Sequence, residues 1–177
     1  WYQAQFVGGG GQVRQGQARY FDYNIALAEQ NGLLYVGSTG LANHAMGLFG
    51  DSQVNVTPVA QNWVFALNTL PTETAVKYPV PVNDAIGIAT NGVPFYSVVA
   101  AETDTLTSLD DPNVSETYTI NIGVNRTNYL GPDAGNGFIA SGDAYVYRMN
   151  PSLLYTADSS QHSPLLGFAL DGNPIYG

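Results

Sequence analysis

The sequence predicts an all-β domain, an antiparallel sandwich of short strands with long loops, preceded by a glycine-rich N-terminal arm. Of its 177 residues only 11% are charged, against about a quarter in typical domains. Gly (20), Pro (10) and Tyr (12) are plentiful, and turn-forming residues separate short apolar runs. The chain has no long apolar pattern of helical period, so we expect helix only in single turns.

Residues 1–17 differ from the rest and form the predicted docking arm, with 18–177 as a single β-rich domain. The run Gly8–Gly11 makes this arm flexible, and Trp1, Tyr2 and Phe6 give it three large aromatic side chains. Exposed aromatic side chains are costly unless they dock on a surface. We expect them to pack on a neighbouring subunit, or alternatively on their own domain.

Tight turns of the Asn-Gly and Asp-Gly type punctuate the predicted strands. Asn31-Gly32 predicts a hairpin between a strand at 19–29 and one at 33–36, although 25–30 also has helix propensity. Asn91-Gly92 and Asp171-Gly172 predict two further hairpins. The other strands are expected at 54–57, 62–67, 85–89, 93–99, 116–122, 144–148, 166–170 and 174–176.

Three segments are predicted to lie outside the sheets. Residues 71–81 form a connection rich in Pro, Thr and Glu, and 133–142 form a loop rich in Gly, Asn and Asp. Residues 151–155 could form a single helical turn.

Charge and composition exclude several classes of function. The net charge is −9, and the five basic residues are scattered, so neither nucleic acid nor an anionic membrane surface is an expected partner. No apolar run is long enough to span a membrane. The absence of cysteine excludes disulfides, zinc–thiolate sites and thiol nucleophiles.

Other features indicate an extracellular or cell-surface protein. The chain begins at Trp1 and not at Met, which we interpret as the result of processing. The sequons at Asn55, Asn113 and Asn125 are candidate glycosylation sites. The acidic stretch 102–116 matches no calcium-binding loop pattern, so we interpret it as a solvated loop.

Two blocks resemble the signatures of a known family. The stretch from His162 to Gly177 and the stretch 87–95 resemble signature blocks of the YHYH-domain family of secreted and cell-surface proteins. The turn at Asn43-His44 resembles an early histidine-containing turn of that family, so the likeness runs roughly from Leu33 to Gly177.

The chain departs from that family where its histidines are expected. Tyr145-Val146-Tyr147-Arg148 stands in place of the Tyr-His-Tyr-His element, and 134–137 stand in place of a Cys-Gly-Gly-His stretch. The resemblance implies a metal or redox centre in typical members. Here only His44 and His162 remain as weak metal candidates, with carboxylate help from Asp143 or Asp171. A structural role for both histidines is favoured, and we expect a degenerate member with no metal or cofactor.

The sequence therefore favours a structural or adhesive extracellular protein over an enzyme. We expect it to assemble with copies of itself, into a filament or surface layer, through sheet-edge and arm contacts. The alternatives are a carbohydrate-binding module that stacks sugars on tyrosine or tryptophan, and a metal-dependent enzyme of the YHYH type.

Overall fold

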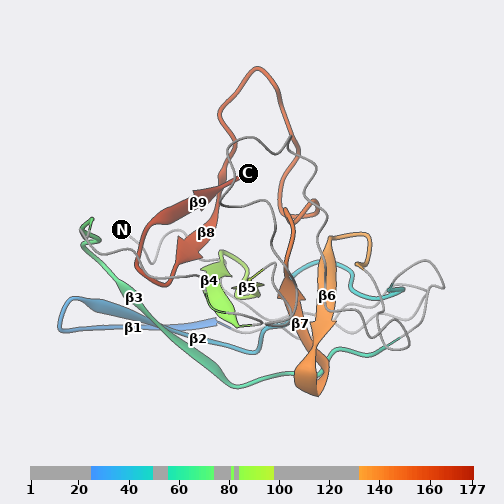
Figure 1. The fold of residues 1–177 in the computed structure, drawn as a ribbon, viewed down its shortest axis with the longest axis horizontal. Helices are drawn as coiled ribbons and strands as arrows, with labels where there is room; N and C mark the ends of the chain where they lie inside the picture. Colours follow the sequence, from blue (N-terminus) through green and yellow to red (C-terminus); the bar gives the residue numbers. More distant parts are fainter. Residues whose placement is uncertain (1–24, 50–55, 74–80, 82–83, 98–131) are drawn as a thin grey trace.

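The computed structural model describes residues 25–49, 56–73, 81, 84–97 and 132–177 (Figure 1). Within these residues the chain is all-β, as predicted, and its only helical element is the 3₁₀ segment Ser141–Asp143. The strands are β1 (Ile25–Gln30), β2 (Leu33–Ser38), β3 (Trp63–Asn68), β4 (Ala85–Ala89), β5 (Pro94–Tyr96), β6 (Gly137–Ala140), β7 (Ala144–Tyr147), β8 (Leu165–Ala169) and β9 (Pro174–Tyr176).

The strands form two sheets. One has the order β1-β2-β3, and the other has the order β6-β7-β5-β4-β8-β9. All pairs are antiparallel except β5 with β7, so the larger sheet is mixed. In the described part of the chain, no helix has the length and apolar character needed to cross a membrane.

The predicted hairpin at Asn31-Gly32 is confirmed. Asn31 has φ 54° and Gly32 has φ 77°, the left-handed pair that a two-residue hairpin turn requires. The helical alternative for 25–30 is wrong, because β1 pairs residue by residue with β2.

The turn at Asn91-Gly92 joins β4 to β5 and also brings the two sheets together. The Ser38 hydroxyl, at the end of β2, donates to the Gly92 carbonyl at 2.7 Å. A β-carbon on Gly92 would lie 2.5 Å from the Ser38 Oγ, so only glycine permits this approach.

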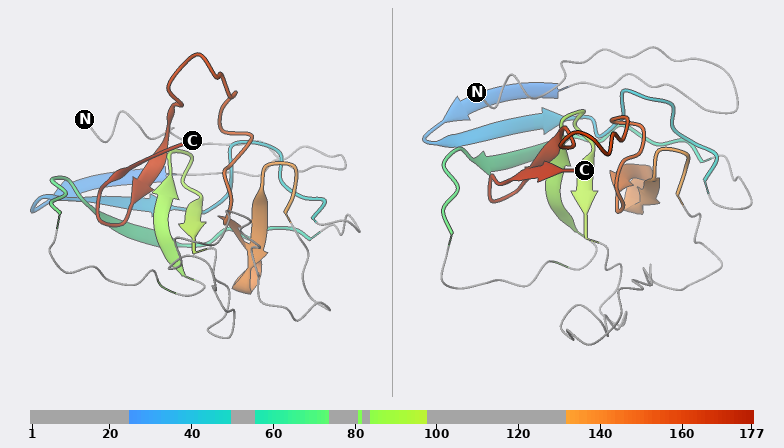
Figure 2. Two further views of the ribbon diagram at one scale, coloured as in Figure 1. Left: turned by 45° about the horizontal axis from the view of Figure 1, so that its top comes forward. Right: turned by 90° about the horizontal axis from the view of Figure 1, so that it is seen from above.

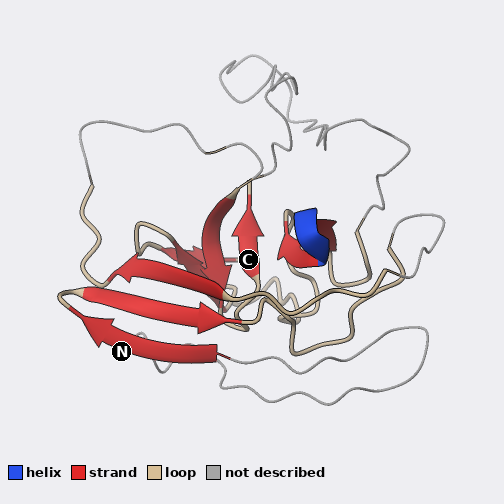
Figure 3. Cartoon of the chain, turned by 90° about the horizontal axis from the view of Figure 1, so that it is seen from below, coloured by secondary structure: helices blue, strands red, loops and turns tan. Residues whose placement is uncertain are grey.

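Figure 2 shows the smaller sheet lying against β4 and β8 of the larger one, and an apolar layer joins the two sheets there. Leu34, Val36 and Leu67 of the smaller sheet meet Ile88 and Phe168 of the larger one, and each is at most 1% exposed. Burial of each such side chain contributes about 1.5–3 kcal/mol, so this layer holds the sheets together. Figure 3 shows the three strands of the smaller sheet side by side.

One loop prediction and one strand prediction need correction. Residues 133–142 are not a loop throughout, because Gly137–Ala140 form β6 and pair with β7. Of the predicted strand 54–57, the described residues Val56 and Thr57 are not in a strand; Pro58, which follows them, has no amide hydrogen to donate to a neighbouring strand. At 151–155 one turn forms, with the Leu154 amide donating to the Pro151 carbonyl at 3.0 Å. The predicted strand 116–122 and the arm 1–17 lie outside the described residues.

Candidate functional site

The loop between β2 and β3 places His44 against β7. His44 Nδ1 lies 2.9 Å from the Ala45 carbonyl, which can only accept a hydrogen bond, so Nδ1 carries the hydrogen. In the neutral ring Nε2 is then an acceptor, and it lies 2.6 Å from the Tyr147 hydroxyl, which donates to it. Both ring nitrogens are therefore bonded to groups of the protein.

Asn91 continues this hydrogen-bond chain. Its Nδ2 donates to the Tyr147 hydroxyl oxygen and to Asn43 Oδ1, both at 3.1 Å. Its Oδ1 accepts from the Val93 amide at 3.3 Å. Asn91 is 1% exposed, so its polar atoms depend on these partners. The turn that follows β4 thus holds both β7 and the loop of His44.

A second buried cluster is centred on the Asp133 carboxylate. Its Oδ1 accepts from the amides of Gly135 and Gly137, each at 2.9 Å, and its Oδ2 accepts from the Gly47 amide at 3.2 Å. The Tyr145 hydroxyl donates to the same carboxylate, with its oxygen 2.9 Å from Oδ2. The carboxylate thereby joins β7 to the loop of His44 and to the turn before β6.

Glycines allow the rings to pack against the backbone of this turn. A β-carbon on Gly137 would lie 1.9 Å from Tyr145 Cζ, and one on Gly135 would lie 2.8 Å from His44 Cε1. A side chain at position 137 would therefore displace the Tyr145 ring from Asp133.

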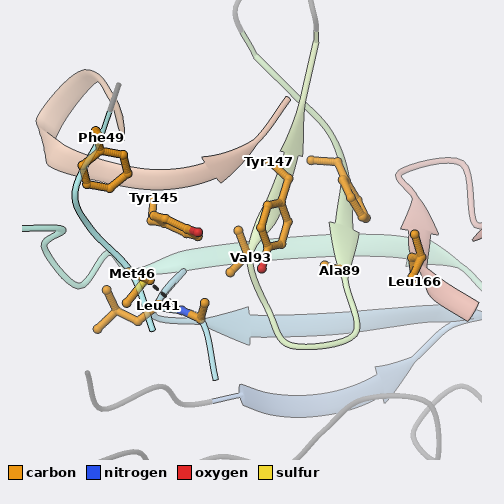
Figure 4. Packing of buried hydrophobic residues seen from close by; sticks show 10 residues of the cluster. Leu41, Met46, Phe49, Ala89, Val93, Tyr145, Tyr147 and Leu166 are labelled. Atoms are coloured by element: carbon orange, nitrogen blue, oxygen red, sulfur yellow. Dashed lines mark hydrogen bonds between the residues drawn. The ribbon is translucent and has the colours of Figure 1, made fainter. Parts of the chain in front are cut away.

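The two tyrosines lie inside a cluster of apolar side chains (Figure 4). Tyr145 is 1% exposed and Tyr147 is fully buried. Their rings meet edge-on with centroids 5.7 Å apart, and Phe49 packs against Tyr145 at 6.2 Å. Burial raises the pKa of both hydroxyls above the usual value of tyrosine, so both stay protonated near neutral pH.

Burial also controls the charge of His44. Removal from water lowers the pKa of its imidazole, whereas the Ala45 carbonyl and the Asp133 carboxylate act in the opposite direction and do not fully offset it. The neutral ring is therefore the dominant form at neutral pH. In this neutral ring Nε2 is free of hydrogen and can accept the hydrogen bond that the Tyr147 hydroxyl donates.

Comparison with known proteins gives one match. A family model described as "YHYH protein" matches residues 63–177, well over half of the chain. The chain belongs to the YHYH family. No curated protein and no solved structure matches it. The resemblance predicts a likeness that begins near Leu33, but the matched region begins at Trp63. The loop of His44 therefore precedes the matched region.

The stretch Tyr145–Arg148, which the resemblance places at the YHYH element, consists of β7 without Ala144, together with the residue after the strand. Because side chains alternate along a strand, Tyr145 and Tyr147 face the cluster of His44. Val146 faces the other side, where it packs with Phe138 and Ala144. Arg148 donates to the Ser97 carbonyl and lies over the Tyr96 ring, 5.3 Å from its centroid.

Positions 146 and 148, where the resemblance places the two histidines of the YHYH element, thus direct their side chains to the face of β7 opposite His44. Histidines at 146 and 148 would point away from the imidazole of His44, across the sheet. Position 137, where the resemblance places a third family histidine, has no room for a side chain while the Tyr145 hydroxyl donates to Asp133. These residues do not fit a metal held jointly with His44.

The other candidate ligands lie apart from this cluster. His162 is exposed, with Nδ1 2.7 Å from the Ser163 carbonyl, and its ring meets that of Tyr176 edge-on. Asp143 is exposed beside β7, and Asp171 Oδ1 accepts from the Asn173 amide in the last hairpin turn. Among the described residues, no three His, Cys, Asp or Glu side chains are grouped as a metal site requires.

The sequence does not reveal the hydrogen-bonding roles of Asp133, Asn91 and Asn43. The local pattern predicts only turns at Asn43 and Asn91 and a loop at Asp133. Nothing in the local pattern shows that their side chains bond residues tens of positions away. The glycosylation candidates Asn55, Asn113 and Asn125, and the arm residues Trp1, Tyr2 and Phe6, lie outside the described residues.

Proposed function

We propose that this YHYH protein is an extracellular structural protein whose copies assemble into a filament or surface layer. The proposal is supported by the hydrogen bonds of the two tyrosines in the YHYH element and of His44. His44 bonds the Ala45 carbonyl and the Tyr147 hydroxyl, and Tyr145 bonds the Asp133 carboxylate, so their polar atoms have partners inside the protein. A catalytic group must reach a substrate, whereas these groups fix a loop and a turn to β7.

Composition supports assembly as the purpose of this fold. A low content of charge and many Thr, Asn and Tyr residues suit extensive contact between subunits. The arm of residues 1–17 offers three aromatic side chains that can dock on a neighbour. In this proposal the protein is not an enzyme, and its principal partner is another copy of itself.

Concentration-dependent assembly tests the proposal. Light scattering of the purified chain should give a mass that rises with protein concentration, and electron microscopy should show regular filaments or sheets. A monomeric mass at every concentration, with no ordered particles, contradicts it.

The extracellular location has its own test. A secreted chain that passes through a glycosylating route would carry glycan on at least one of Asn55, Asn113 and Asn125. Intact mass before and after enzymatic deglycosylation measures this occupancy. Retention of the expressed full-length protein inside the cell contradicts the location.

A carbohydrate-binding module is the second candidate, and one exposed aromatic pair favours it. Tyr176 is 49% exposed, and His162 meets its ring with centroids 4.8 Å apart. Tyrosine faces at a surface can stack on sugar rings. Loss of glycan binding in Tyr176→Ala, without any change in assembly, would favour this candidate over the first.

A further inference from the structure

β3 is an edge strand of the smaller sheet. The sheet order is β1-β2-β3, so no strand among the described residues is hydrogen-bonded to its outer edge. The Thr69 amide donates to the Gly32 carbonyl at 3.1 Å. Along an antiparallel strand, successive residues direct their backbone N–H and C=O groups to opposite sides. The backbone groups of Phe65 and Leu67 therefore face β2, and those of Val64 and Ala66 face outward.

The side chains of β3 include none of the charged residues that usually prevent an edge strand from pairing with another chain. Proteins commonly protect edge strands with charged residues. β3 has none between Trp63 and Asn68, whereas β1, at the opposite edge, carries Glu29. Val64 is 67% exposed, and Leu70, just after the strand, is 79% exposed. Among the described residues, the outer edge of β3 therefore carries no charge and has no strand hydrogen-bonded to it.

We infer that β3 pairs with β3 of a second copy of this chain, antiparallel and about a two-fold axis. The inference rests on the proposed function of self-assembly and locates one of its contacts. With 14 acidic and 5 basic residues, two copies repel wherever their charged surfaces meet. An uncharged strand meeting its own copy avoids that repulsion, and a two-fold contact uses the same surface on both partners.

The contact is short and does not build a filament alone. A β-carbon on Gly172 would lie 2.0 Å from the Asn68 carbonyl oxygen, so the turn between β8 and β9 lies against the end of β3. Within the described part of the chain, this leaves Val64 and Ala66 as the outward-directed residues of β3 with no neighbouring strand. A two-fold contact gives dimers, and the arm contacts of the proposed function would then link the dimers into a larger assembly.

A matched pair of lysine substitutions tests the edge. Ala66 and Ala28 are both exposed, and both lie opposite Tyr35 of β2, one on each edge strand of the same sheet. Ala66→Lys should raise the concentration needed for assembly by about tenfold or more, because it brings like charges together in the dimer. Ala28→Lys adds the same charge and should leave assembly unchanged.

The outcomes separate the inference from the function on which it rests. If the parent chain assembles and Ala66→Lys assembles equally well, the β3 contact is wrong and self-assembly stands. If the parent chain stays monomeric, the proposed function fails and the inference fails with it. Circular dichroism and thermal melting establish that both lysine variants are folded.

Cross-linking gives a second measurement that does not depend on a disruptive charge. The chain has no cysteine, so Ala66→Cys and Ala28→Cys each introduce one thiol. A short bis-maleimide should link two copies of Ala66→Cys and not two copies of Ala28→Cys. Equal cross-linking of the two variants, or none at position 66 in an assembling sample, overturns the inference.

Discussion

His44 Nε2 lies 2.6 Å from the hydroxyl oxygen of Tyr147, although the two residues are 103 positions apart in the chain. The contact joins the loop after β2 to the end of β7. It also places the second tyrosine of the YHYH element in a structural role, since its hydroxyl has Asn91 as its other partner.

Replacing Tyr147 with Phe should destabilise the protein by about 1–3 kcal/mol, because His44 Nε2 and an Asn91 donor lose a buried partner. Urea unfolding followed by circular dichroism measures the change in the free energy of unfolding. Tyr176→Phe is the control, since Tyr176 is 49% exposed and its change should stay within about 0.5 kcal/mol. Equal stability of the two variants would show that the His44–Tyr147 contact contributes little.

His44 should make stability depend on pH. Burial lowers the pKa of its imidazole in the folded state, so the unfolded chain, with a histidine pKa near 6.5, takes up the proton first as pH falls. The contribution is complete above about pH 6.5 and is lost as pH falls toward the lower folded pKa.

The comparison that isolates this effect is the parent chain against His44→Gln between about pH 5 and pH 8. Carboxylates titrate in both proteins, so their contribution cancels in the difference between the two free energies of unfolding. That difference should shrink as pH falls. A difference that is constant with pH would rule out His44 as the source.

Position 137 should tolerate only glycine, because the Tyr145 ring occupies the space of a side chain there. Gly137→Ala places a β-carbon on the Tyr145 ring and should cost about 1–3 kcal/mol or more. Gly37→Ala is the matched control within a strand, because its nearest neighbour would be 3.6 Å away, an ordinary contact. Thermal melting distinguishes the two, and equal melting temperatures would argue against the packing described for Tyr145 and Gly137.

The hairpins could be predicted from sequence because their signals are local. Asn31-Gly32, Asn91-Gly92 and Asp171-Gly172 each stand between short apolar runs, and each becomes a turn between paired strands. β6 could not be predicted in this way. Its first residue, Gly137, looks like a turn residue, yet the glycine is required by a ring that comes from β7.

The candidate site was only partly predictable for the same reason. The two tyrosines and His44 were visible as members of family-like motifs. Their partners Asp133 and Asn91 looked like ordinary turn residues, because side-chain bonds between distant segments leave no periodic signal. The opposite directions of Val146 and Tyr147 follow from strand alternation, but only once β7 is known to be buried on both faces.

The arm can be tested independently of the described residues. Removing residues 1–7 deletes Trp1, Tyr2 and Phe6, and burial of each such side chain is worth about 1.5–3 kcal/mol. We expect assembly to fail while the domain still folds and melts cooperatively. A truncated chain that assembles as well as the parent, or one that cannot fold, contradicts a role of the arm between subunits.

Retention of the YHYH frame without its histidines also predicts the metal content. Purified protein should contain no stoichiometric copper, zinc or iron, because both nitrogens of His44 are bonded within the protein and Arg148 brings a positive charge to the element. Elemental analysis measures this. One equivalent of metal, lost on replacing His44 or His162, would contradict it.

Self-assembly is the central claim, and sedimentation velocity over a wide range of protein concentration tests it most directly. The account predicts a sedimentation coefficient that rises with concentration, with ordered filaments or sheets in electron micrographs of the heaviest fractions. A single monomeric species at every concentration, with no ordered particles, would contradict it.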